Sequence, residues 1–339
     1  MKALVTGGGG FLGQSIVRRL LERGATVRSF SRQPHAALRT LGVEQLQGDL
    51  GDSAAVAAAV MGCDVVFHTA AKAGLWGPFE EYHRANVLGT ENVIAACRKH
   101  AVSRLVFSSS PSVVFHGGDM EGVNESVPYP DHFEAHYPET KAAAEQMVRR
   151  ANDAQLTTVS LRPHLIWGPG DNHLLPRLAA RARAGQLRRI GRARKLIDTV
   201  FVENAADAHV LAADRLAPGA VIGGKAYFIS QGEPIETWEM INRLLEAAGV
   251  PTVHRVVPYR LAWWLACSLE SWHRLTRNPH EPRLTRFLVS ELCTSHWFDL
   301  SAARKDLGYT PAISTAEGLR RLQADLGSIP GKATLPPVH

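Results

Sequence analysis

The sequence predicts an α/β fold in which helices cover both faces of a parallel sheet, followed by a smaller and mostly helical C-terminal part. Over the first 165 residues, short β-branched runs alternate with longer, alanine-rich amphipathic stretches. Such alternation builds parallel sheets, and strands that are buried on both faces are apolar throughout. After residue 171 the chain becomes rich in arginine and then in tryptophan, which indicates a separate, largely helical region.

Six apolar runs are the expected strands of this sheet. They cover residues 2–6, 26–30, 43–47, 64–68, 104–109 and 157–162. Patterns with a helical period lie between them, at about 11–23, 53–61, 80–100 and 138–152. Because a crossover through a helix returns the chain to the same edge of the sheet, we expect consecutive strands to be parallel.

The change in amino-acid composition after residue 171 divides the chain into two interleaved parts. We expect the sheet domain to span residues 1–165 and to be completed by isolated strands near 199–202 and 226–229. The smaller part, 166–327, is expected to lie over the strand ends, where open α/β sheets bind ligands. The last segment, 328–339, is rich in proline and poor in large apolar residues, so we expect a disordered tail.

Composition indicates a soluble globular protein. The 339 residues are 45% hydrophobic, and no apolar leader precedes the glycines of "MKALVTGGGG". No uncharged apolar window approaches the roughly 20 residues of a membrane span, so we expect a cytoplasmic location. The four cysteines are widely scattered, which is typical of reduced thiols.

Two polar patterns carry weaker functional signals. The net charge is +6, and much of it lies in the basic stretch 177–195. This stretch lacks interleaved aromatic residues, so we expect no nucleic-acid partner, and it is either a solvated helix face or a site for an anionic substrate or acidic partner. His132 and His136 have the helical spacing of a metal site, but no third ligand is evident and we expect no metal.

The glycine-rich stretch "VTGGGGFLG" (5–13) follows the first strand and opens the first helix. In that context Gly7 or Gly8 permits a tight turn, Gly10 lets the backbone approach a pyrophosphate, and Gly13 allows the helix to pack closely on the strand. Phe11 and Leu12 of the first helical turn are expected to line the same site. The pattern predicts a dinucleotide at the helix N-terminus.

The end of the second strand bears on the choice of dinucleotide. NAD-preferring sites usually place an acidic residue there, which accepts hydrogen bonds from the adenosine ribose. Here Ser31 and Arg32 occupy that position, and a hydroxyl with a guanidinium can bind a 2′-phosphate. We therefore expect NADP(H) rather than NAD(H), unless Arg32 simply projects into water.

"YPETK" (137–141) sets a phenol and an ammonium one helical turn apart. The ordinary interpretation is a pair of i, i+4 neighbours behind Pro138, which suits a first helical turn. The chemical interpretation is that Lys141 stabilises the phenolate of Tyr137, so that the tyrosine can exchange a proton with a substrate. The pair by itself leaves both interpretations open.

The chain as a whole resembles the extended short-chain dehydrogenase/reductase family over about residues 1–325. Ordered motifs carry the resemblance: "TGGGGFLG" (6–13), "GDL" (48–50), "HTAA" (68–71), "NVLGTENV" (86–93), "SSSPSV" (108–113), "YPETK" (137–141) and "LRPHLIWGPGD" (161–171). It implies a Rossmann-type doubly wound sheet, a nicotinamide dinucleotide and oxidoreductase chemistry on a CH–OH group. Dimers through two helices of the sheet domain are common in the family, so a homodimer is a further expectation.

The resemblance also assigns roles to individual residues. It implies that Asp49 contacts the adenine, that Lys141 holds the nicotinamide ribose, and that the segment of Pro163 borders the nicotinamide. A hydroxyl after the fifth strand would donate to the developing oxyanion, and Ser110 fits the spacing, with Ser109 and Ser112 as alternatives. The other expected cofactor contacts are Leu50, Ala70, Ala71, Lys72, Asn86 and Ser108, although a packing role suits Asn86 nearly as well.

Several branches of the family share this framework, including nucleotide-sugar epimerases and dehydratases, 3β-hydroxysteroid dehydrogenases and flavonoid-type ketone reductases. "PRLTRF" (282–287) is similar to the 3β-hydroxysteroid branch. "AAKAGLWG" (70–77), "NVIAACR" (92–98) and "ELCTSHW" (291–297) resemble bacterial reductases of 2-alkyl-3-oxoalkanoic acids in olefin biosynthesis. That resemblance implies NADPH-dependent reduction of a lipid-like β-keto acid. The alternative outside the enzymes is a regulator or scaffold that binds the cofactor and catalyses no reaction.

A stripe of large apolar residues follows one face of the helix predicted over 259–277. Its members are Leu261, Trp264, Leu265, Leu269, Trp272 and Leu275. The stripe is either core, a cap around Trp263, Trp264 and Trp272 that covers an apolar substrate chain, or a surface that lies on a membrane with its flanking arginines. Peripheral association with a membrane or with pathway enzymes is therefore among the expectations.

Overall fold

The computed structural model describes residues 1–278 and 280–327, so the expected tail at 328–339 lies outside the described residues. A seven-stranded sheet of order β12-β7-β5-β4-β1-β2-β3 forms the centre of the molecule, and its paired strands are all parallel. The strands are β1 (Lys2–Thr6), β2 (Thr26–Ser31), β3 (Glu44–Gln47), β4 (Val65–His68), β5 (Arg104–Ser108), β7 (Thr157–Pro163) and β12 (Ala226–Ile229). The predicted doubly wound α/β fold is confirmed.

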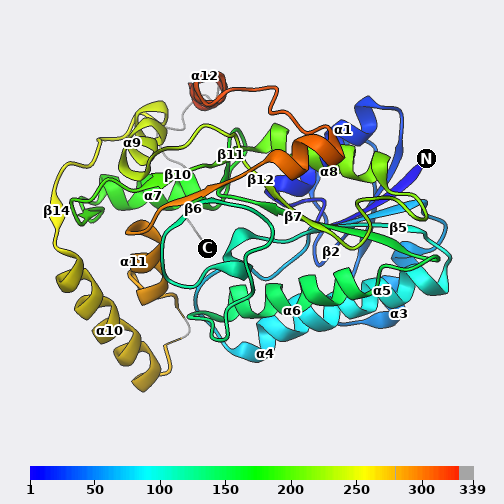
Figure 1. Cartoon of the computed structure of the whole chain (residues 1–339), viewed down its shortest axis with the longest axis horizontal. Helices are drawn as coiled ribbons and strands as arrows, with labels where there is room; N and C mark the ends of the chain where they lie inside the picture. The colour runs from blue at the N-terminus through cyan, green and yellow to red at the C-terminus, as the bar shows by residue number, and fades with distance from the viewer. Residues whose placement is uncertain (279, 328–339) are drawn as a thin grey trace.

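Helices cover both faces of this sheet (Figure 1). One face carries α1 (Phe11–Glu22) and α8 (Val202–Arg215), and the other carries α3 (Ser53–Val60), α5 (Gly89–Lys99) and α6 (His136–Arg150). Side chains alternate between the two layers, since Ala3 and Val5 join one core while Leu4 joins the other. Apolar contacts on both faces explain why the strands are apolar throughout.

One strand expected in this sheet lies elsewhere. Residues 226–229 form β12, which pairs with β7 along its whole length, from Ala226 opposite Ser160 to Ile229 opposite Pro163. The segment near 199–202 gives the short β11 (Val200–Phe201), which pairs instead with β8 (Ile166–Trp167). β12 is thus the last strand at this side of the central sheet, and β11 belongs to a separate two-stranded sheet.

The smaller part consists of helices with short strands. Its helices are α7 (Leu174–Arg183), α9 (Thr237–Ala247), α10 (Tyr259–Leu275), α11 (Arg286–Leu292) and α12 (Thr315–Gly327). The strands β10 (Leu196–Ile197), β13 (Ile235–Glu236) and β15 (His296–Phe298) form one small sheet with β6 (Met120–Val123), which comes from the first 165 residues. Strand β9 (Arg189–Ile190) pairs with β14 (Val256–Val257). Short connecting helices are α2 (Ala36–Thr40), α4 (Phe79–Tyr82), η1 (His83–Leu88), η2 (Pro111–Val114) and η3 (Ala303–Leu307).

The apolar stripe of α10 does not form core. Leu261, Trp264 and Trp272 are 60%, 70% and 61% exposed, and the helix buries the opposite face, through Ala262 and Ala266. The expected cap around Trp263, Trp264 and Trp272 is therefore wrong for the last two, which point to solvent. Periodicity predicted the stripe correctly, but small alanines let the other side of α10 approach its neighbours.

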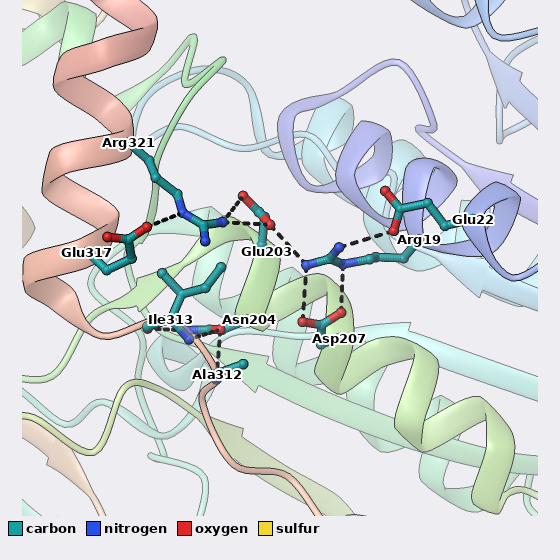
Figure 2. A network of polar contacts seen from close by, with 9 residues as sticks. All are labelled: Arg19, Glu22, Glu203, Asn204, Asp207, Ala312, Ile313, Glu317 and Arg321. Carbon is teal, nitrogen blue, oxygen red and sulfur yellow. Dashed lines mark hydrogen bonds and ion pairs between the residues drawn. The ribbon is translucent and has the colours of Figure 1, made fainter.

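A network of charges joins the two ends of the chain (Figure 2). Arg19 on α1 binds Glu203 and Asp207 on α8 at 2.9 Å and 2.8 Å. Glu203 also pairs with Arg321 on α12 at 3.3 Å. The C-terminal helix is thus tied to the first helix through α8, so the two parts are interleaved in space as well as in sequence.

A buried ion pair fixes α6 on the sheet. Arg162 on β7 donates two hydrogen bonds to the carboxylate of Glu145 on α6, at 2.6 Å and 3.0 Å, and both side chains are fully buried. Tyr129 donates a third hydrogen bond to Glu145 at 2.6 Å. Burial alone would raise the pKa of Glu145, but the hydrogen bonds and charge of Arg162 outweigh it and hold this pKa low.

Replacing Arg162 with methionine should destabilise the protein by about 3–5 kcal/mol, because Glu145 would become a buried and unpaired carboxylate. The double variant Arg162→Met with Glu145→Met removes both charges and should recover much of that loss. Midpoints of guanidinium-induced unfolding would rank the parent and the two variants by stability. A single variant as stable as the parent would contradict this account of the ion pair.

Candidate active site

A cleft of about 1090 Å³ lies at the carboxyl ends of the central strands. Seventeen of the residues predicted to hold the cofactor or to act in catalysis line it. They are Gly7, Gly10, Phe11, Leu12, Gly13, Ser31, Arg32, Asp49, Leu50, Ala70, Ala71, Lys72, Ser108, Ser110, Tyr137, Lys141 and Pro163. Segments from across the first 165 residues therefore meet at one site, as the fold requires of strand ends in a parallel sheet.

The glycine turn has the geometry of a phosphate cradle. Gly7 adopts a φ of +69°, and a side chain there would meet the Ala70 backbone at 2.9 Å. A side chain at Gly13 would collide with the carbonyl oxygen of Gly7. Helix α1 begins after Gly10 without an acidic residue in its first turn, and Gly10, Phe11, Leu12 and Gly13 all line the cleft. These features fit the pyrophosphate of a dinucleotide.

The expected adenosine end holds several polar groups. Ser31 donates a hydrogen bond to the carbonyl of Gln33 at 2.7 Å, and Arg32 is exposed at the cleft. Asp49 accepts from the Gly51 amide at 2.7 Å and pairs with Arg84 at 3.2 Å. Sequence reasoning missed Arg84, which lines the cleft but lies in a helical segment without a motif of its own.

Tyr137 and Ser110 lie together in the cleft. Burial raises the pKa of the Tyr137 phenol to about 12, and a hydrogen bond with Ser110 acts in the opposite direction. The Ser110 hydroxyl also shares a 2.9 Å hydrogen bond with Ser112. Ser109 and Ser110 both line the cleft, and of these two it is Ser110 that acts on the pKa of the tyrosine.

Lys141 is one turn along α6 and is almost fully buried. Its Nζ donates to the backbone carbonyl of Ser108 at 2.6 Å and lies 3.9 Å from the centre of the Phe107 ring. Burial lowers the pKa of Lys141 to about 7, although the charge of Glu145 opposes the shift. The ammonium is thus held at a fixed point of the cleft wall, one turn from the phenol.

The hydroxyl of Ser108 is engaged behind the cleft. His209 Nδ1 lies 2.7 Å from the Ala205 carbonyl, to which it donates, so Nε2 accepts from Ser108 at 2.6 Å. Burial lowers the pKa of His209 to about 4, so the ring is neutral. The hydroxyl of Ser108 is therefore bound to His209, and its backbone carbonyl accepts the hydrogen bond from Lys141. No motif marked His209, because it lies about a hundred residues away on α8.

Asn86 is not among the residues that line the cleft, so its expected contact with the cofactor stays a prediction. It is 2% exposed and binds the backbone of Lys72 in both directions, at 2.7 Å and 3.1 Å. Its amide also donates to Thr140 on α6 at 3.0 Å. Asn86 lies in η1, a π-helical turn, and there it holds the Lys72 loop against α6.

Glu291 is a second residue that sequence reasoning missed. It lies near the end of α11, and its charge acts to raise the pKa of Tyr137. Burial raises the pKa of Glu291 itself to about 7, with a smaller contribution from Glu134. The motif "ELCTSHW" begins at this residue, but nothing in its spacing indicates that α11 reaches the neighbourhood of Tyr137.

The model of the 3-beta hydroxysteroid dehydrogenase/isomerase family matches residues 4–260. The chain belongs to this family. A 2-alkyl-3-oxoalkanoate reductase from Stenotrophomonas maltophilia is 53% identical over 326 residues, which are 96% of this chain and 99% of that protein. A reductase of the same name from Shewanella oneidensis is 47% identical, over 96% of this chain and 86% of that protein.

Solved structures support the same framework. A UDP-glucose 4-epimerase from Thermus thermophilus, in complex with NAD, is 25% identical and superposes with a TM-score of 0.73 over 97% of this chain and 99% of that one. As a member of the family, the chain has the framework of a nicotinamide-dependent oxidoreductase. Within residues 1–278 and 280–327, no helix is long and apolar enough to cross a membrane. The same residues contain no cluster of His, Cys, Asp and Glu that could hold a metal ion.

Two glycine variants should separate binding from stability. Gly13→Ala should lower both the thermal midpoint and dinucleotide affinity, because the added methyl meets a backbone oxygen that cannot move freely. In Gly10→Ala the added methyl would lie 3.2 Å from the same oxygen, so we expect little loss of stability. The methyl would stand where the pyrophosphate approaches α1, so dinucleotide binding should be roughly tenfold weaker. Titration calorimetry and thermal melting would measure the two effects. Unchanged affinity in Gly10→Ala would contradict the phosphate cradle.

Proposed function

We propose that the protein is an NADPH-dependent reductase that converts a 2-alkyl-3-oxoalkanoic acid to the 2-alkyl-3-hydroxyalkanoic acid, in the formation of long-chain hydrocarbons. The meeting of Tyr137, Lys141 and Ser110 in one dinucleotide-sized cleft carries the proposal. The two bacterial relatives that bear this activity in their names support the choice of substrate. When bound, the nicotinamide supplies the hydride, and the chain must then supply a proton and stabilise charge.

Tyr137 is the proton donor in this proposal. Because burial keeps its pKa near 12, the phenol is neutral and carries the proton needed on the carbonyl oxygen. Ser110, which acts to lower the pKa of the phenol, would donate to the same oxygen and stabilise negative charge on it. Lys141 lies one turn away, and as an ammonium it would lower the cost of the phenolate that remains after proton transfer.

Arg32 and Ser31 are the basis for preferring NADPH. Arg32 is exposed at the end of the cleft where we expect the adenosine, and there its guanidinium would bind a 2′-phosphate. The strand ends in Ser31 rather than in a carboxylate, which would repel that phosphate. Arg84 and His35 line the same region and add positive charge or hydrogen-bond donors. The glycine turn would hold the pyrophosphate, and Pro163 would border the nicotinamide.

We expect the parent to bind NADPH at least about tenfold more tightly than NADH, since one charge-assisted pair to the 2′-phosphate contributes ~1.5–3 kcal/mol. The double variant Ser31→Asp with Arg32→Ala should reverse the order, because the new carboxylate repels the phosphate. Fluorescence titration with NADPH and NADH would measure the affinities of the parent and of the variant. Equal affinities in the parent would contradict the proposed preference.

The substrate class can be tested with a series of 2-alkyl-3-oxoalkanoic acids of increasing chain length. Each buried CH₂ contributes up to ~0.8 kcal/mol, so kcat/KM should rise several-fold for every two carbons until the cavity is full. Keto-steroids and UDP-sugars belong in the same assay of NADPH oxidation. A flat chain-length profile with turnover of a steroid or a UDP-sugar would move the protein to another branch of the family.

Tyr137→Phe is the matched control for chemistry in that assay. It keeps the ring and removes the proton donor, so turnover should fall by roughly 10² or more while NADPH affinity stays near the parent value. If the parent binds NADPH but turns over no ketone or alcohol at all, the protein is a cofactor-binding regulator instead.

A further inference from the structure

Helix α10 lies at one end of the molecule (Figure 1). One face of this helix is exposed and mostly apolar. Its members are Leu261, Trp264, Leu265, Ser268, Trp272 and Leu275, which we call the outer face of α10. Trp264 is 70% exposed and Leu275 is 79% exposed. Two tryptophans and three leucines in one exposed stripe exceed the scattered apolar residues that ordinary protein surfaces carry.

The unpaired charges of α10 itself and of the turn that follows it are basic. Arg260 and Arg277 stand near the two ends of α10, and neither side chain has a hydrogen bond or ion pair to any residue in the described part of the chain. Glu270 is the one acidic residue in the helix, and it is 6% exposed on the opposite side. There Arg286 binds it at 2.9 Å and Arg274 approaches to 3.7 Å.

This charge pattern disfavours a second copy of the chain as the occupant. In a two-fold dimer through the outer face, antiparallel copies of α10 would place the Arg260 end of one against the Arg277 end of the other. Like charges would then meet at both ends of the contact. An anionic surface, by contrast, would attract the arginines at both ends of the helix.

The position of α10 also connects it to the active site. Trp76 follows the cleft residues Lys72 and Ala73 by a few positions, and its indole donates to the Asn278 carbonyl at 3.2 Å, just past α10. Its ring packs edge-on against His273 of α10 at 5.9 Å. The end of α10 is therefore joined to the loop that leaves the cleft.

We propose that the outer face of α10 binds the surface of an anionic lipid membrane, with the helix parallel to that surface. Tryptophan and leucine would enter the headgroup boundary while Arg260 and Arg277 contact lipid phosphates. Seventeen residues, three of them Arg or Glu, are too short and too polar to span a bilayer, so the helix would lie on the membrane. The proposal does not depend on the substrate assigned above.

Vesicle co-sedimentation with the full chain tests this proposal. The parent should bind vesicles of phosphatidylcholine with phosphatidylglycerol, bind phosphatidylcholine alone several-fold less, and lose anionic binding in high salt. Trp264→Ser with Leu265→Ser should weaken binding at least about tenfold, since two inserted apolar side chains are lost. Val221→Ser is the matched control, because Val221 is 71% exposed but lies far from α10 in sequence.

Thermal midpoint and NADPH affinity should stay at the parent values in both variants, which shows that neither has lost its fold. Arg260→Gln with Arg277→Gln should reduce binding to the anionic vesicles and leave binding to the neutral ones unchanged. Absence of binding by the parent, or parent-like binding by the Trp264/Leu265 variant, overturns the proposal. So does a parent dimer in sedimentation velocity that the same variant converts to a monomer, because the face would then belong to a second copy.

Discussion

The buried ion pair between Arg162 and Glu145 sets the position of α6, and the candidate active site depends on that position. Tyr137, Lys141 and Glu145 follow one another at intervals of four residues, so they share one face of the helix. Arg162 holds the last of them against β7. Because Glu145 is already bound by Arg162 and Tyr129, Lys141 has no direct carboxylate partner and donates to the Ser108 carbonyl instead. The amino group of Lys141 is thereby held at the wall of the cleft.

Burial shifts the two titrating groups of α6 in opposite directions. It raises the pKa of Tyr137 to about 12 and lowers that of Lys141 to about 7, and in both cases it favours the uncharged form. A neutral phenol is the form that can give up a proton. In the proposed reaction Tyr137 would give up its proton, and Ser110, which acts to lower the pKa of the phenol, would reduce the cost of the phenolate that remains. Glu291 opposes that ionisation from α11, so the C-terminal part also tunes the tyrosine.

The cleft is built from parts that are distant in sequence but rigidly joined. Asn86 ties the Lys72 loop to Thr140 on α6, and Trp76 ties the continuation of that loop to the end of α10. On the far side of the sheet, Arg19, Glu203 and Arg321 connect α1 through α8 to α12. The cofactor half and the C-terminal half are thus held by polar contacts at several separate places, which limits how far one can move against the other.

The sequence by itself determined the doubly wound sheet, the glycine turn and the pair of Tyr137 and Lys141, because period, turn chemistry and helical spacing are local properties. It could not determine that the segment 199–202 pairs with β8 outside the central sheet, since the partner of a short strand is set by the tertiary fold. It marked Asn86 but not its role, because only packing decides whether an amide faces a ligand or a neighbouring loop. His209 and Glu291 carried no local signal and reach the site through the tertiary fold. The stripe on α10 was visible in the sequence, yet its exposure was decided in three dimensions, where two alanines on the other side gave the closer packing.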